Sequence, residues 1–150
     1  MRRDDQSEHD PYGLERFALA QNNAGVYDDA VDELRRGHKT SHWMWFVFPQ
    51  LAGLGHSTTS RHFAISSLDE ARAYLAHPLL GPRLRQCMEI LLATEDSAAE
   101  QILGPIDARK LHSCATLFQR SAPDDLVFPQ VLTRFFDGQP DQLTDDRLGE

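Results

Sequence analysis

The chain has 150 residues, of which 15 are Lys or Arg and 23 are Asp or Glu, giving a formal net charge of −8. This length predicts one domain, and 41% hydrophobic with 25% charged residues excludes both a disordered tail and a membrane protein. The negative charge disfavours general binding to nucleic acids or to anionic lipid surfaces.

The first predicted helices are read from apolar spacing and from the residues that end each run. Asp10 is predicted to cap a helix ahead of Pro11, because Asp favours the cap position and Pro the first turn. A second helix is predicted over about residues 26–36. Gly37 follows it at the position where a glycine commonly ends a helix.

Residues 43–48 form the longest apolar run of the chain. Their composition suits a buried strand, but a single strand would leave its backbone groups without partners. We therefore predict a short helix there, capped by Thr40 or Ser41 and ended by Pro49. A membrane-spanning helix needs about 20 residues, so this run is too short to be one.

The rest of the chain repeats the pattern of cap, apolar stripe and break. Residues 67–70 and 97–100 each match a capping box, which predicts the start of a helix. Asp107 is predicted to cap a further helix, another is expected over residues 125–136, and a last short helix follows. The fold prediction is all-α: a single compact domain of about seven or eight short helices over residues 1–150.

We expect both ends of this domain, residues 1–10 and 139–150, to be less ordered because they are polar. No apolar stretch follows the basic start of the chain, so no secretory signal is expected. Cys87 and Cys114 fit no spaced disulfide framework, which favours a reducing compartment. These features together predict a cytoplasmic protein.

Charge is distributed unevenly, because residues 34–68 contain no Asp or Glu. At the acidic content of this chain, roughly five carboxylates would be expected there by chance. The same residues include several cations and both tryptophans, Trp43 and Trp45. Cations, hydrogen-bond donors and flat rings in a carboxylate-free region suit an anionic ligand with a planar part, such as a nucleotide-like compound.

Two interpretations of these residues stay open at this point. The aromatic residues are most simply core residues, and the acid-free stretch then reflects their burial. In the ligand-binding interpretation, Lys39 and Arg61 hold the charge, and Trp43 or Trp45 stacks on the ligand. Hydrogen bonds would come from Ser41, Gln50 and Ser60. The one candidate for a proton-transfer, and hence catalytic, role is His42, since an imidazole titrates near neutral pH.

Residues 53–61 predict a polar, glycine-bearing loop that leads to a short helix, a junction whose backbone N–H groups can hold a phosphate. The alternative interpretation of these residues is an ordinary turn. No metal site is predicted, because His38, His42, His56 and His62 have no nearby Cys, Asp or Glu to complete a ligand set. No cofactor is predicted, and both cysteines occupy apolar stripes typical of core packing.

The block Trp43-Met44-Trp45-Phe46, within residues 37–51 and followed by 53–55, resembles the domain-of-unknown-function family 1810. Further matching positions are residues 70–71, 73–75, 77–78, 80–81, 83–84, Gly104, Asp107, Lys110, Leu111, Ser113 and residues 116–118. The resemblance implies a compact, mostly helical, cytoplasmic bacterial protein and carries no activity. Some members bear a calpastatin label, although calpastatin-type inhibitors are disordered and this chain is rich in core residues.

A fainter resemblance concerns residues 40–43, followed by residues 77–79 and Asp107. Their order is similar to the motifs of a helical superfamily that acts on NAD- and ADP-ribose-like compounds. In that group a Glu stands beside the His, whereas residues 34–68 here hold none. The resemblance therefore favours a nucleotide-type ligand more than it favours catalysis.

The first functional hypothesis is a helical protein that binds an anionic, nucleotide-like or ADP-ribose-like metabolite, with processing of that ligand as an extension. The second is a protein–protein interaction module without a small-molecule site, in which exposed Trp43, Trp45 or Phe48 would form an apolar patch. Neither a membrane nor a nucleic acid is an expected partner, and the sequence indicates no particular protein partner.

Overall fold

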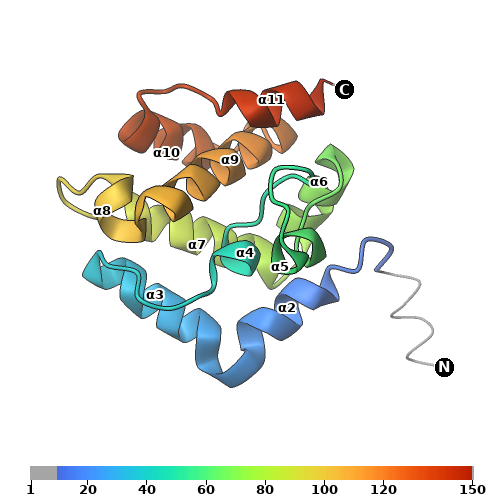
Figure 1. Ribbon diagram of the computed structural model, residues 1–150, viewed down its shortest axis with the longest axis horizontal. Helices are drawn as coiled ribbons and strands as arrows, with labels where there is room; N and C mark the ends of the chain where they lie inside the picture. Colours follow the sequence, from blue (N-terminus) through green and yellow to red (C-terminus); the bar gives the residue numbers. More distant parts are fainter. Residues whose placement is uncertain (1–9, 150) are drawn as a thin grey trace.

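The computed structural model describes residues 10–149 and confirms the all-α prediction (Figure 1). Within that range the backbone contains helices, turns and one isolated parallel bridge between Leu51 and Ile65, and no strand. No helix in the described range is long and apolar enough to cross a membrane. The expectation about residues 1–9 concerns a segment outside these residues.

The elements follow one another in the order α2 (Glu15–Asn22), η1 (Asn23–Gly25), α3 (Val26–Arg36), α4 (Met44–Val47), α5 (Thr58–His62), α6 (Leu68–Ala76), α7 (Leu80–Leu92), α8 (Ala99–Leu103), α9 (Pro105–Ser121), α10 (Val127–Phe136) and α11 (Gln142–Leu148).

Helix α9 crosses the middle of the molecule and packs against α6, α8, α10 and α11, while α7 packs against α3, α6 and α10 (Figure 1). The largest side chains that are fully buried include the rings of Phe17, Trp43, Phe48, Tyr74, Phe118 and Phe128. Burial of such rings contributes about 1.5–3 kcal/mol each, which makes the aromatic residues the main apolar contribution to the core.

The first and second predicted helices meet at a sharp corner. Ala24 and Gly25 have positive φ angles of 52° and 71°, and this left-handed turn separates α2 from α3. Gly37, at φ 73°, ends α3 as the sequence predicts. The predicted N-cap at Asp10 is wrong, because α2 begins at Glu15 with Leu14 at the N-cap position, and Pro11 lies in the turn before it. The Asp10 carboxylate instead accepts hydrogen bonds from the backbone N–H groups of Leu14 and Glu15 across that turn.

Two of the other predicted caps need correction. At residues 97–100 the helix starts one residue later: Ala98 is the N-cap, and the side chain of Gln101 accepts the backbone N–H of Ala98 at 2.8 Å. Asp107 is not an N-cap, because α9 begins at Pro105 and Asp107 lies within its first turn. By contrast, Ser67 caps α6 by accepting the N–H of Glu70 at 3.1 Å.

The apolar run of residues 43–48 forms the short helix that the sequence predicts, α4. Neither Thr40 nor Ser41 caps it, because Trp43 occupies the N-cap position and makes no side-chain cap. At the C-terminal end of the chain, α11 is the predicted last helix, and Thr144 on it is fully buried.

The segment after α4 is held by two backbone bonds to Ile65. The N–H of Ile65 donates to the carbonyl of Gln50, and the N–H of Ala52 donates to the carbonyl of Ile65, both at 2.8 Å. We call residues 50–53 the strap. Because these bonds hold the strap against the chain just before α6, the strap runs past α5. Cavities border the strap on either side.

Helices α6 and α7 approach each other at Gly81, where a Cβ would collide with the backbone oxygen of Leu75. A backbone neighbour cannot move aside cheaply, so Gly81→Ala is expected to lower the free energy of unfolding by about 1–3 kcal/mol in urea denaturation. The control is Gly149→Ala, whose Cβ would meet only ordinary contacts at 3.5 Å or more. Equal stability of the two variants would contradict the close packing.

Candidate functional site

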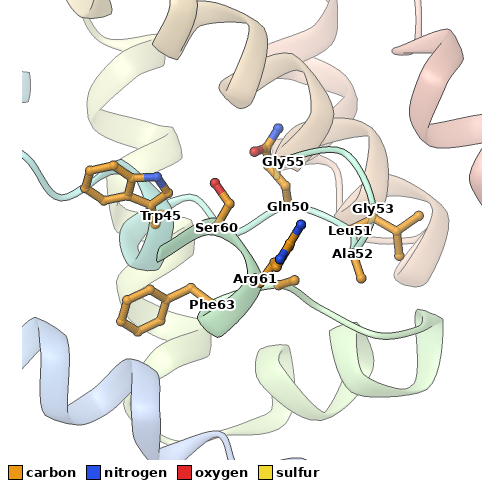
Figure 2. Close-up of a pocket in the computed structure, with 10 residues that line it drawn as sticks. Trp45, Gln50, Leu51, Ala52, Gly53, Gly55, Ser60, Arg61 and Phe63 are labelled. Atoms are coloured by element: carbon orange, nitrogen blue, oxygen red, sulfur yellow. The ribbon is translucent and has the colours of Figure 1, made fainter. Parts of the chain in front are cut away.

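A cavity of about 140 Å³ lies between the strap and α5 (Figure 2). It is lined by Trp45, Gln50, Leu51, Ala52, Gly53, Gly55, Ser60, Arg61, Phe63 and Ala64. Four of the eight ligand-binding residues predicted from the sequence are in this lining: Trp45, Gln50, Ser60 and Arg61.

Arg61 is the charged group of this cavity. Its side chain rises from α5 toward the strap (Figure 2), and it is exposed to solvent. It forms no ion pair with any residue in the range 10–149. Its guanidinium therefore keeps its full capacity to bind an anion, and a planar fork of donors suits phosphate or carboxylate oxygens.

The turn before α5 holds Ser60 at the cavity wall. Ser57 caps the helix by accepting the backbone N–H of Ser60 at 3.1 Å, and the two hydroxyls are hydrogen-bonded at 2.9 Å. Gly55 passes so close to this turn that an added Cβ would lie 2.6 Å from the Cβ of Ser60. The absence of a side chain at residue 55 is therefore what lets the loop close over the start of α5.

Aromatic rings form the apolar part of the lining. Trp45 and Phe63 are both partly buried, and the Phe63 ring packs against Phe46 with centroids 5.2 Å apart. The Nζ atom of Lys110 lies 5.0 Å from the centroid of the Trp45 ring, a cation–π distance. Lys110 does not line the cavity and pairs with Asp107 at 3.6 Å, so the positive charge that the cavity combines with ring surface is that of Arg61.

The four other predicted residues, Lys39, Ser41, His42 and Trp43, do not line this cavity. Trp43 is fully buried, so its ring belongs to the core in this structure. His42 is exposed on the segment before α4. Part of the acid-free segment, residues 34–68, therefore packs in the interior of the protein.

Lys39 is held by the protein itself. Its Nζ atom lies 2.9 Å from the carboxylate of Asp107, donates to the carbonyl of Ser41 at 2.5 Å and stands 4.9 Å from the centroid of the Trp43 ring. The side chain is only 8% exposed. Its charge is therefore compensated internally, by an acid from outside the acid-free segment.

Glu33 organises the segment that contains these residues. It projects from α3 into the interior and is 4% exposed. Its carboxylate accepts hydrogen bonds from the backbone N–H groups of Thr40 and Ser41 at 2.7 and 2.9 Å, from the Ser41 hydroxyl at 2.5 Å and from the Trp43 indole at 3.0 Å. Four donors satisfy a buried charge that would otherwise be very unfavourable.

These bonds also set the ionisation of Glu33. Burial by itself raises the pKa, but the hydrogen bonds from Ser41, Thr40 and Trp43 outweigh it and lower the pKa from 4.5 to about 2. At neutral pH the carboxylate is fully ionised and is a weak proton acceptor. Glu33 therefore acts as an anchor for residues 40–43, and its geometry does not suit it as a general base.

Neither a metal-binding cluster nor an ionised cysteine is found in the described range. Among residues 10–149, no group of three or more His, Cys, Asp or Glu side chains is placed to hold a metal ion. Cys87 and Cys114 are both buried, as the sequence predicts. Burial raises the pKa of the Cys87 thiol to about 12 and that of Cys114 well above its usual value, so both remain protonated.

Glu33, Phe63 and Lys110 are not among the site residues predicted from the sequence. Glu33 lies one position before the acid-free stretch, so a count within residues 34–68 excluded it. One signal was available: Glu33 is three residues after Ala30, which places its side chain on the apolar face of its helix. An acid on a core-facing stripe indicates a buried, hydrogen-bonded carboxylate.

Comparisons with known proteins place this chain in a family. The model of a protein family described as "Protein of unknown function (DUF1810)" matches residues 11–148, so the chain belongs to that family. A similar solved structure is the crystal structure of the conserved hypothetical protein Rv1873 from Mycobacterium tuberculosis, with 46% sequence identity and a TM-score of 0.90. The match covers 94% of this chain and 99% of that one. No curated protein matches the chain.

The structure predicts an acid-dependent contribution of Glu33 to stability. Because its folded-state pKa is lowered, the contribution is present above about pH 4.5 and is lost as the pH falls to about 2. Glu33→Gln is expected to lower the unfolding free energy at pH 7 by about 3 kcal/mol, the equivalent of that pKa difference.

The measurement is urea unfolding of wild type and Glu33→Gln at several pH values. The difference between the two proteins should shrink as the pH falls from 4.5 to 2. The control is Glu89→Gln, an exposed acid on α7. A constant difference over that pH range would contradict the role of the Glu33 carboxylate.

Proposed function

We propose that this protein binds an anionic metabolite with a planar part, of the nucleotide or ADP-ribose kind, in the cavity between the strap and α5. The observation that carries the proposal is Arg61. It lines a cavity beside the rings of Trp45 and Phe63, and it has no ion-pair partner in the described range. A cation without an internal partner, next to ring surface, suits a phosphate attached to a planar group.

The charge around the cavity supports an anionic ligand. None of the described residues that line it is acidic, although the chain as a whole carries a net charge of −8. A local positive site in an acidic protein discriminates against cations and orients an approaching anion. Gln50 and Ser60 add uncharged hydrogen-bonding groups to the same wall.

The size of the cavity limits which part of a ligand it holds. At about 140 Å³ it is smaller than the roughly 300–1,000 Å³ of a typical site for a whole drug-sized ligand. We therefore assign to it one phosphate and the edge of the planar ring that stacks on Trp45. The remainder of the ligand lies outside this cavity.

The proposal concerns binding, and processing of the ligand is not part of it. The one candidate for proton transfer, His42, is exposed and is not among the residues of the cavity wall. Glu33 is satisfied by four donors and keeps its charge. No described titratable group other than Arg61 lines the cavity.

The alternative, an interaction module built on exposed aromatic residues, has less support. Of the three residues that it offers for an exposed patch, Trp43 and Phe48 are fully buried and Trp45 is partly buried. The large apolar residues that are exposed in the described range lie apart in sequence: Leu19, Ile106, Leu126 and Leu143. Single exposed apolar residues are ordinary on protein surfaces and do not define a partner site.

The proposal predicts ligand-dependent stabilisation of the wild-type protein. With AMP, NAD or ADP-ribose at a hundredfold excess over its Kd, the melting temperature should rise by roughly 5–10 °C. Arg61→Ala should abolish the shift, since it removes the phosphate-binding group. The matched control is Arg36→Ala, an exposed cation on α3 that does not line the cavity.

Two results in a fluorescence-monitored melting experiment would refute the proposal. One is the absence of a shift with all three compounds. The other is an Arg61→Ala protein that responds as strongly as wild type while Arg36→Ala is also unchanged.

A further inference from the structure

Gln50 brings to the cavity between the strap and α5 an amide group that the protein itself does not use. Its backbone carbonyl accepts the N–H of Ile65 and so holds the strap. Its side chain is partly buried, lines the cavity (Figure 2) and forms no hydrogen bond with any residue in the range 10–149. In the same range every fully buried side-chain nitrogen or oxygen has a hydrogen-bond partner. The unbonded amide of Gln50 is therefore not sealed in the interior and is accessible from the cavity.

The other glutamines in the described range differ from Gln50. Five of them have a side chain that is hydrogen-bonded to the protein: Gln21, Gln86, Gln101, Gln119 and Gln142. Two more, Gln130 and Gln139, are exposed at the surface. Among these residues, Gln50 alone combines partial burial with an amide that has no partner in the described part of the chain. Since partly buried polar groups are normally satisfied, this amide is available to a bound ligand.

The remaining polar side chains of the cavity wall are suited to donate hydrogen bonds. The Arg61 guanidinium has no acceptor atom. The Ser57 hydroxyl donates to the Ser60 hydroxyl at 2.9 Å, which leaves the proton of Ser60 for a ligand. No acid is among the described residues that line the cavity, so Gln50 is the one lining side chain with a carbonyl oxygen. Phosphate oxygens can use the donors, whereas the Gln50 carbonyl can accept an N–H group of the ligand.

We infer that Gln50 recognises the polar edge of a nucleobase that stacks on Trp45, where an N–H donor lies beside a hydrogen-bond acceptor. An amide pairs with such an edge through two hydrogen bonds, one donated and one accepted. Both an aminated base such as adenine and an oxo base such as hypoxanthine have such an edge, and the unbonded amide is free to turn to match either. This inference rests on the proposed function, because it identifies the planar part of the same ligand, whose phosphate binds at Arg61.

The test compares three nucleotides by isothermal titration calorimetry on the full chain at fixed salt. AMP and IMP have an N–H donor on the edge of the base, whereas purine riboside monophosphate lacks this donor. Wild type should bind AMP, IMP or both about fivefold more tightly than the purine nucleotide, which corresponds to one hydrogen bond. The nucleotide that has this advantage identifies the base as aminated, as oxo or as either kind.

Two substitutions at Gln50 separate recognition of the base from a structural role. Gln50→Met has a similar length without the amide, so it should remove the advantage over the purine nucleotide while the backbone bond to Ile65 stays in place. Gln50→Glu keeps an acceptor and should retain the advantage, although its negative charge weakens the binding of all three nucleotides. The matched controls are Gln130→Met and Gln130→Glu, at an exposed glutamine on α10 that does not line the cavity. Neither control should change the relative affinities.

The outcomes separate this inference from the proposed function. Equal affinity of wild type for the three nucleotides, or an advantage that survives in Gln50→Met, overturns the assignment of Gln50 and leaves the cavity as an anion-binding site. Loss of the advantage in Gln50→Glu as well as in Gln50→Met also overturns it, because the acceptor is then not the group that recognises the base. Absence of binding by all three nucleotides overturns the proposed function and this inference with it. An advantage that is lost in Gln50→Met and kept in Gln50→Glu supports recognition of the base by Gln50.

Discussion

The arrangement of the candidate site depends on one buried carboxylate. Glu33 is the acid toward which the backbone of residues 40–41 and the indole of Trp43 turn, and it replaces water as their partner. Leaving such a charge buried without these donors would cost several kcal/mol, so the segment and the carboxylate hold each other in place. These bonds therefore fix the start of α4. The position of that start in turn sets the direction of the chain through Trp45 and the strap.

Ion pairs with acids from distant parts of the chain determine which cation of residues 34–68 has no counter-charge. Lys39 and Arg61 look equivalent in the acid-free stretch, yet Asp107 on α9 reaches Lys39, and no acid in the described range reaches Arg61. A lysine surrounded by a carboxylate, a carbonyl and an indole serves packing. Arg61, which has no ion-pair partner among residues 10–149, keeps its charge available to another molecule. The same local composition thus supports two different roles.

Local features of the chain were predictable because they depend on near neighbours. The end of α3 at Gly37, the cap at Ser67 and the short helix after Trp43 each follow from a few adjacent residues. The start of α8 was displaced by one residue, because Gln101 rather than Glu100 accepts the backbone N–H at the N-cap, and the Ser97 hydroxyl donates to the carbonyl of Glu95 instead. Such competition between neighbouring polar residues cannot be resolved from spacing alone.

The candidate site was predictable to the extent that it is local. Trp45, Gln50, Ser60 and Arg61 lie within one stretch of chain that folds around a single cavity. The functions of Glu33 and Asp107 depend on contacts between α3, α9 and the segment before α4, which no local pattern encodes. The composition of residues 34–68 therefore indicated the segment that lines the cavity, but it did not indicate that Asp107 pairs with Lys39 or that Glu33 accepts the indole N–H of Trp43.

The attachment of the strap has a mechanical consequence. Two backbone bonds to Ile65 hold it, and Leu51 within it is also buried in the hydrophobic core. Because Leu51 lines the cavity beside Arg61 as well, a displacement of the strap would change the shape of that cavity and the packing of the core together. The width of the cavity is therefore tied to close packing in the interior, which resists such a displacement.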